Sequence, residues 1–84
     1  MEATKSINID RVAYIDAIEP CIETAILRNQ KYGNSIDLCS DRTIMELCQM
    51  KLERNKRMVP TDPKYYDEIE DCVNYLVYLL MRRK

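Results

Sequence analysis

A helical spacing of apolar residues near the C-terminal end constrains the fold of this chain more than any other feature. The apolar side chains recur there at steps of three and four residues, which places them on one side of an α-helix but on both faces of a β-strand. A cap residue followed by proline, at Thr61-Asp62-Pro63, predicts where this helix begins, and the basic residues 82–84 suit the negative end of its dipole. The stripe consists of Ile69, Cys72, Val73, Leu76, Val77 and Leu80.

Another segment near the start of the chain shows the same period. Apolar residues at helical spacing run from about Asp10 to Tyr32, with Pro20 inside the pattern. This proline either kinks one long helix or opens a second segment at its first turn, where proline is tolerated, and we favour one kinked helix over the whole range. Gly33 is the only glycine of the chain and directly follows this run, as is typical of a helix end.

A further helix is predicted between these two. Ser40 or Asp41 can cap its first turn, and Thr43 with Glu46 fits a capping box as well. We expect this helix to end near Met58, because a proline two residues later disfavours helical backbone in the residue between them. Its apolar stripe consists of Ile44, Leu47, Cys48 and Leu52.

The length of 84 residues allows one domain. Residues 1–9 show no apolar period and are predicted to form a flexible arm, so that residues 10–84 form a single all-α domain, a small bundle of about three helices. Because the other side of the last helix is unusually apolar as well, one small core cannot cover both sides, and we expect self-association, at least to a dimer. The residues on that other side are Tyr75, Tyr78, Leu79 and Met81.

Charge and cysteine usage exclude several classes of function. The net charge is −1, so nothing attracts the whole chain to nucleic acid or to an anionic membrane. No apolar run approaches the roughly 18 residues of a membrane span. The four cysteines contain no CxxC pair and the chain has no histidine, which disfavours a zinc site. Residues 1–8 lack an apolar signal region, and we expect a reduced, cytoplasmic setting with free thiols.

Two charged pairs could carry chemistry. Lys51 and Arg54 lie three residues apart at the edge of the apolar stripe of the middle helix. A lysine there must extend its charged end to the solvent, pair with an acid, or contact an anion such as phosphate. Glu68 and Asp71 lie three apart on the last helix. Carboxylates so placed can hold magnesium, but they can equally pair with those two cations.

Aromatic and amide side chains add a candidate surface for a base. Lys31 and Tyr32 precede a turn whose backbone N–H groups could receive an anion, and the ring of Tyr32 could stack on a base. Asn74 and Tyr78 continue the acidic side of the last helix and offer an amide and a second ring.

Three short motifs carry a resemblance to a known family. Segments 31–35 (KYGNS), 50–54 (MKLER) and 71–76 (DCVNYL) resemble, in this order, the small helical phage proteins called nucleotide modification associated domain, type one. These proteins are similar to the all-α MazG-like nucleotide pyrophosphohydrolases. The resemblance spans about residues 20 to 80, and it implies an all-α bundle that oligomerises and handles nucleotides.

The MazG-like enzymes hold magnesium between acidic motifs on two neighbouring helices. Glu68 and Asp71 match the second of these motifs, which implies a metal-binding role for both. The first motif is not matched, because Lys51 and Arg54 stand where acids are expected. One helix provides too few carboxylates for a site of two or three metal ions, so the resemblance implies nucleotide handling more firmly than it implies hydrolysis.

Four functions remain open, and we favour the first. It is the binding, without turnover, of a nucleotide or another phosphate-bearing small molecule, with Lys31, Lys51 and Arg54 on the phosphates and Tyr32 or Tyr78 on the base. Such a phage-type protein would sequester a nucleotide signal or inhibit a host defence. The second is a magnesium-dependent nucleotide pyrophosphohydrolase, and the third an adaptor or inhibitor that contacts a host protein through the last helix. A helix-turn-helix DNA binder, suggested by the basic residues 51–57, is the weakest alternative.

Overall fold

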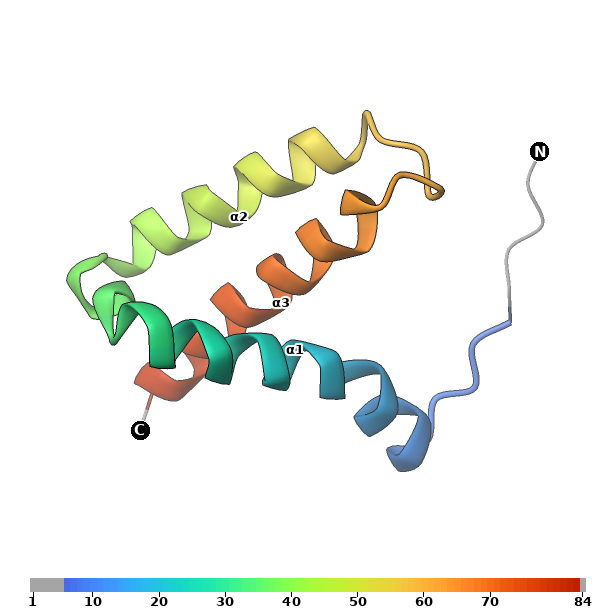
Figure 1. Cartoon of the computed structure of the whole chain (residues 1–84), viewed down its shortest axis with the longest axis horizontal. Coiled ribbons are helices and arrows are strands. Elements are labelled where there is room, and N and C mark those ends of the chain that lie inside the picture. The colour runs from blue at the N-terminus through green and yellow to red at the C-terminus, as the bar shows by residue number, and fades with distance from the viewer. Residues whose placement is uncertain (1–5, 84) are drawn as a thin grey trace.

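The computed structural model describes residues 6–83 and confirms an all-α fold. No strand occurs within this range. Residues 1–5 of the predicted arm, and Lys84, lie outside the described residues, while residues 6–9 are exposed and non-helical. The elements, in chain order, are α1 (Arg11–Tyr32), the short 3-10 helix η1 (Ser35–Leu38), α2 (Asp41–Asn55) and α3 (Lys64–Arg82) (Figure 1).

The first helix, α1, is continuous over 22 residues and contains Pro20, as the sequence predicts. Its first turn is capped by Asp10, whose Oδ1 accepts a hydrogen bond from the backbone N–H of Ala13 at 2.8 Å. After its last turn, Gly33 takes a φ of 68° and donates its N–H to the carbonyl of Asn29. Positive φ is strained in residues with a Cβ atom, so this glycine fixes the point where the chain leaves α1.

Of the caps that the sequence allows for α2, the structure uses Ser40. Its Oγ accepts a hydrogen bond from the backbone N–H of Thr43 at 3.1 Å. The helix ends at Asn55, three residues before the predicted end at Met58. The N–H of Met58 bonds instead to the carbonyl three residues earlier, so the chain tightens into a turn before the proline that follows.

The third helix, α3, begins at Lys64, one residue after the predicted first position. The backbone N–H of Lys64 donates to Oδ1 of Asp62 at 2.9 Å, which satisfies one of the free donors at this helix end. Pro63 therefore directly precedes the helix instead of opening it.

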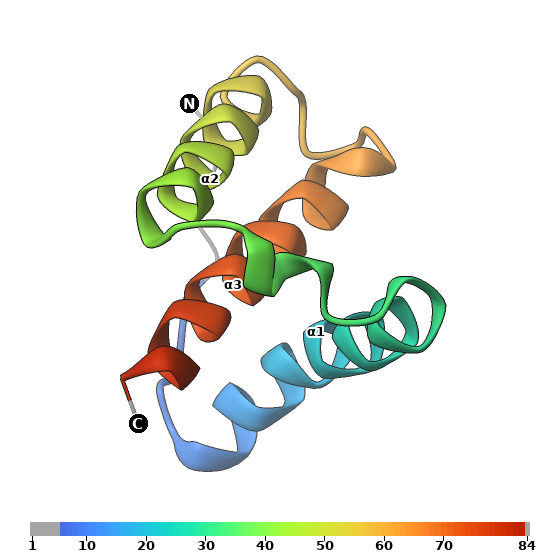
Figure 2. The same cartoon turned by 90° about the vertical axis from the view of Figure 1, so that its left-hand side faces the viewer.

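The last helix lies at the centre of the domain. Figure 2 shows α3 between α2 on one side and α1 on the other. The loop between α2 and α3 is short, and these two helices run back along one another and share most of the contacts between helices. The C-terminal half of α1 crosses the middle of α3, so that residues from all three helices meet there.

The apolar core is small. Its buried apolar residues, within the described range, are one isoleucine and three cysteines: Cys21, Ile44, Cys48 and Cys72. The sulfurs of Cys48 and Cys72 each lie 3.7–3.9 Å from the backbone carbonyl of the other residue, so small side chains bring α2 and α3 close together. Burial raises the pKa of all three buried thiols, which keeps them neutral, as small apolar groups.

Part of the apolar stripe of α3 does not face this core. Cys72 is buried, but Leu76, Val77 and Leu80 remain partly exposed. The sequence places these residues on one stripe, and the structure shows that the stripe is wider than the contact that α1 and α2 make with it. No helix among the described residues is long and apolar enough to cross a membrane.

Ile44 is the one large side chain that is completely buried among the described residues. We expect Ile44→Ala to lower the free energy of unfolding by about 3 kcal/mol, because it leaves a cavity between α2 and α3. The matched change Ile7→Ala, on an exposed side chain before α1, is expected to alter it by less than about 0.5 kcal/mol. Urea denaturation followed by circular dichroism measures both, and equal losses would contradict this packing.

Candidate functional site

Five charged side chains from all three helices meet beside the middle of α3. Nζ of Lys51 lies 2.8 Å from Oδ2 of Asp71 and 3.1 Å from Oε2 of Glu68. Nη2 of Arg54 lies 3.3 Å from the same Glu68 oxygen. Nη1 of Arg28, on α1, lies 2.5 Å from Oδ1 of Asp71. The cluster holds three cations and two carboxylates, so it carries one positive charge in excess.

Asp71 is the carboxylate that connects the helices. It is only 9% exposed, and burial alone would raise its pKa, but the hydrogen bonds from Lys51 and Arg28 outweigh burial and hold the pKa below its ordinary value. Burial likewise acts to lower the pKa of Lys51, and its hydrogen bonds to Asp71 and Glu68 reverse this, leaving the pKa of Lys51 raised. Both groups are therefore charged at neutral pH.

The structure supports a structural role for Lys51 and Arg54. The sequence leaves open whether these cations pair with acids or bind phosphate, and here both pair with carboxylates of α3. The side chain of Lys51 is 16% exposed. Neither residue lines the main cavity of the domain, so a direct role for them in phosphate binding stays a prediction.

A magnesium site at Glu68 and Asp71 does not fit this donor set. Magnesium is usually bound by one or two carboxylates together with water and substrate phosphates, and the negative charge of those carboxylates must be free to attract it. The two carboxylates already contact three cations, which leave no excess negative charge for a metal ion. Residues 6–83 contain no group of three or more His, Cys, Asp or Glu side chains that could hold one.

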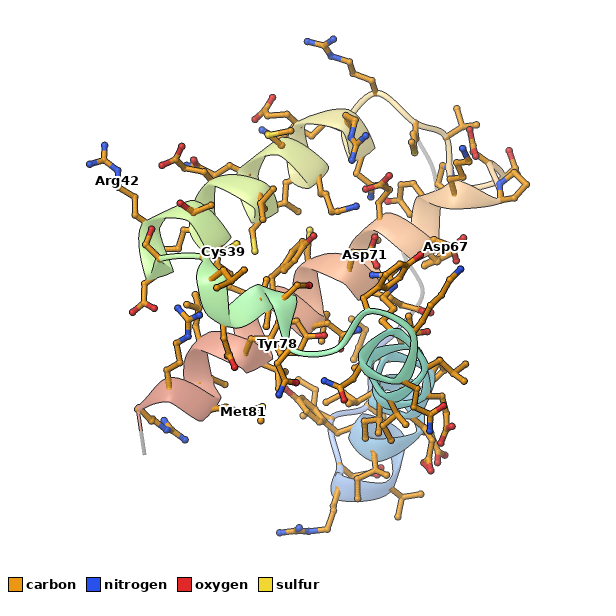
Figure 3. The ribbon with its side chains drawn as sticks, turned by 60° about the vertical axis from the view of Figure 1, so that its left-hand side comes forward. Cys39, Arg42, Asp67, Asp71, Tyr78 and Met81 are labelled. Atoms are coloured by element: carbon orange, nitrogen blue, oxygen red, sulfur yellow. The ribbon has the colours of Figure 1, made fainter. Side chains whose placement is uncertain are left out.

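A cavity of about 550 Å³ lies between the C-terminal half of α1, η1 and α3. Its volume falls within the range of about 300–1,000 Å³ that is usual for small-molecule sites. Figure 3 shows Tyr78 on the side of α3 that faces η1, and Asp71 between α2 and α1. The polar and aromatic groups in its wall include two arginines, three tyrosines and a buried amide: Arg28, Arg82, Tyr32, Tyr75, Tyr78 and Asn74. The wall also holds the amides of Asn29 and Asn34, which bond to one another, and the carboxylate of Asp37.

The amide of Asn74 is a buried polar group in this cavity wall. Asn74 is 5% exposed, and its Nδ2 has no hydrogen-bond partner. A buried amide N–H without a partner costs free energy, so it favours any arrangement that supplies an acceptor. A ligand that reaches this part of the wall could supply one.

Arg82 fixes the wall that η1 forms. Its Nη1 lies 2.6 Å from Oδ1 of Asp41, and its Nη2 donates to the backbone carbonyl of Ile36 at 3.1 Å. These contacts join the end of α3 to η1 and to the start of α2. On α3 itself, the rings of Tyr75 and Tyr78 lie edge to face with centroids 6.4 Å apart, which orders the aromatic side of the cavity.

The cavity unites only part of the residues that the sequence singles out. Tyr32, Asn74 and Tyr78 line it, and Asp71 lies at its border with the ion-pair cluster. Lys31 does not line it and instead lies over the Tyr32 ring, with Nζ 5.2 Å from the ring centroid. The predicted set is thus divided between an aromatic cavity and a separate ion-pair cluster.

The sequence patterns did not single out Arg28, Tyr75 and Arg82 as ligand-binding residues. A signal for two of them was present, because Arg28 precedes Tyr32 by four residues and Arg82 follows Tyr78 by four, so each shares a helix side with a predicted residue. These two helix sides line one cavity only because of the way α1 crosses α3. The spacing of residues within a helix does not specify that crossing.

Comparisons of the chain with models of known protein families, with curated proteins and with solved structures find no match. The resemblance to the type-one nucleotide modification associated domain therefore stays a prediction.

The charge of Asp71 gives a testable dependence on pH. Because its folded-state pKa lies below the ordinary value, its stabilising effect is complete above about pH 4 and is lost as the pH falls through the lower folded-state value. We expect Asp71→Asn to cost about 3 kcal/mol at neutral pH, since it leaves Lys51 and Arg28 without their shared partner. In this variant the free energy of unfolding should also fall less steeply as the pH is lowered than it does in the wild type.

Urea titrations at a series of pH values between neutral and strongly acidic measure both effects. Asp16→Asn, on the exposed side of α1, is the control. Its free energy of unfolding should change with pH as that of the wild type does. The same acid dependence in Asp71→Asn as in the wild type would show that another group carries it.

Proposed function

We propose that this chain binds, without turning it over, a small molecule that combines a planar base with phosphate. The binding site is the cavity between α1, η1 and α3. The observation that carries this proposal is the set of residues in its wall, in which two arginines, three tyrosines and Asn74 line a volume suited to a nucleotide.

Arg28 is the residue best placed to bind phosphate. Its side chain is 49% exposed, and arginine presents planar pairs of donors that match phosphate oxygens. If Arg28 turns from Asp71 to a ligand, Asp71 keeps its contact with Lys51 and is not left as an unpaired buried charge. The excess positive charge of the ion-pair cluster supports an anionic ligand in the same way.

The tyrosines and Asn74 are suited to the base. Tyrosine rings stack on any base, and such stacking is typically worth about 1–3 kcal/mol for each base. The amide of Asn74 can donate to an acceptor on the edge of that base. The combination distinguishes a nucleotide from inorganic phosphate, which would contact only the arginines.

Binding without turnover fits the remaining predictions. A cytoplasmic protein of a phage, in the host cell, could lower the concentration of a free nucleotide signal in this way. The pyrophosphohydrolase that the family resemblance implies has less support, because the carboxylates it needs are paired with cations.

Titration calorimetry and thermal shift with nucleoside triphosphates, cyclic nucleotides and inorganic phosphate, with and without magnesium, test the proposal. Tyr78→Leu and Arg28→Lys are each expected to weaken nucleotide binding by about 10- to 100-fold, because one removes a stacking ring and the other removes the paired donors. Arg83→Gln, next to Arg82 but outside the cavity, is the matched control and should bind as the wild type does.

The same titrations separate the cavity from the basic pair that the sequence favours. If the cavity is the site, Arg54→Ala leaves the affinity unchanged at matched folded fraction, since Arg54 lies outside it. A loss of about 1.5–3 kcal/mol in Arg54→Ala, with Tyr78→Leu binding normally, would assign the phosphate to Lys51 and Arg54 instead. A wild type that binds none of the nucleotides would refute the proposal.

A further inference from the structure

Helix α1 carries a row of exposed aliphatic side chains along its length. These side chains are 47–69% exposed, although none of them has a polar group that water could satisfy. Single exposed apolar residues are common on protein surfaces, but four in one row on one helix are a feature to explain. The row consists of Val12, Ile15, Ile22 and Ile26, and we call it the α1 stripe.

The α1 stripe lies on the side of α1 that faces away from α3. Successive residues of an α-helix are turned by about 100°, so the four side chains lie roughly 120–160° around α1 from Arg28. Arg28 contacts Asp71 of α3 and therefore marks the side of α1 that packs on the domain. Figure 2 shows α3 on this side of α1 and no helix on the other. Packing among the described residues therefore does not account for the stripe.

The spacing of the α1 stripe is that of a seam between two helices. Together with Glu19, its positions follow one another at steps of three, four, three and four residues. This alternation is the heptad pattern with which two helices pack side by side, whereas a helix that packs on a globular core usually has a wider apolar side. From Val12 to Ile26 the seam is about 21 Å long. Its shape fits a second helix that lies along α1.

Three carboxylates accompany this seam. Glu19 stands within it, and Asp16 and Glu23 lie beside it on the flank away from α3. All three are exposed, and none forms an ion pair with a cation of residues 6–83. They lie three and four residues apart, where like charges repel one another and destabilise a helix. Cations from a partner would remove this repulsion.

We propose that the α1 stripe docks an amphipathic helix of another protein, one that carries aliphatic residues at heptad spacing and Lys or Arg beside them. The aliphatic residues pack on the stripe, and the cations face Glu19 and the two flanking acids. A cation opposite Glu19 also sets the register, because a polar residue within a seam disfavours every alignment that leaves it unpaired. The proposal is independent of the nucleotide site, whose α1 residues lie on the side of Arg28.

The carboxylates disfavour the other classes of occupant. A second copy of the chain would bring the same acids against one another across a two-fold axis, and like charges in an interface repel. Anionic lipid and nucleic acid repel these carboxylates as well, and helices that lie in a membrane surface usually carry Lys and Arg on their polar side. A basic helix is the occupant that satisfies both the aliphatic seam and its acids.

Two synthetic helical peptides of about three heptads each are the probes. Both carry leucine at the seam positions. The basic peptide has lysine at the flanking positions, and the acidic peptide has glutamate at the same positions. Fluorescence anisotropy measures their binding to the wild type. We expect the basic peptide to bind about 10-fold more tightly than the acidic one, or better, and this preference to shrink as the salt concentration is raised, because salt screens the charges.

Matched variants locate the binding on α1. Ile22→Ser should weaken the binding of the basic peptide about 10-fold, whereas Leu27→Ser, at an exposed residue outside the stripe, should leave it unchanged. Glu19→Lys combined with Glu23→Lys should reverse the preference, so that the acidic peptide binds more tightly. Glu53→Lys, at an exposed acid of α2, is the control for charge and should keep the preference of the wild type. Circular dichroism checks that each variant is folded.

Equal affinity of the wild type for the two peptides, or no binding of the basic peptide at about 1 mM, overturns the proposal. So does binding that both Ile22→Ser and the charge-reversed variant leave intact. Light scattering and sedimentation with anionic phospholipid vesicles test the other occupants. A wild-type dimer that Ile22→Ser converts to a monomer would assign the stripe to a second copy. Vesicle binding that Ile22→Ser abolishes would assign it to a membrane, and either result refutes the docking of a basic helix.

Discussion

The carboxylate of Asp71 is the contact on which the arrangement of the three helices depends. It is nearly buried at the middle of α3 and accepts hydrogen bonds from Lys51 of α2 and Arg28 of α1. A buried carboxylate without partners would be costly, so both cations must stay near it, and each brings its own helix to α3. With so few buried apolar side chains, this polar contact has an unusually large share in fixing where α1 crosses α3. It specifies the arrangement more than it supplies stability, because much of the attraction between the charges offsets the loss of their hydration.

The cavity follows from that crossing. Arg28 holds the C-terminal half of α1 to α3, and Arg82 holds η1 to the end of α3. The cavity lies between these two contacts, and Tyr78 lines it. The ion-pair cluster and the cavity share Arg28 and Asp71 but differ in chemistry. The cluster places charges of both signs in direct contact, whereas the cavity places aromatic rings and a free amide around an open volume. That difference is the reason why we propose a structural role for the first and a ligand for the second.

The aliphatic stripe of α3 is wider than the contacts that α1 and α2 make with it. Leu76, Val77 and Leu80 stay 38–53% exposed and lie roughly 120–180° around the helix from Asp71, so they point away from the ion-pair cluster.

The sequence by itself determined the helices, because their periods, caps and stops depend on residues within a few positions of one another. Ser40 and Gly33 mark boundaries that the structure keeps, and local signals were wrong by only one residue at Lys64 and three at Asn55. The sequence also offered the pairing of Lys51 with Glu68 and Asp71 as one of two alternatives. Only the tertiary structure showed that these pairs form, and only it brought Arg28, Tyr75 and Arg82 to the same cavity as Tyr32. The physical reason is that the geometry of a helix fixes which of its residues share one side. Which other helix packs against that side depends on contacts between residues that are distant in the chain.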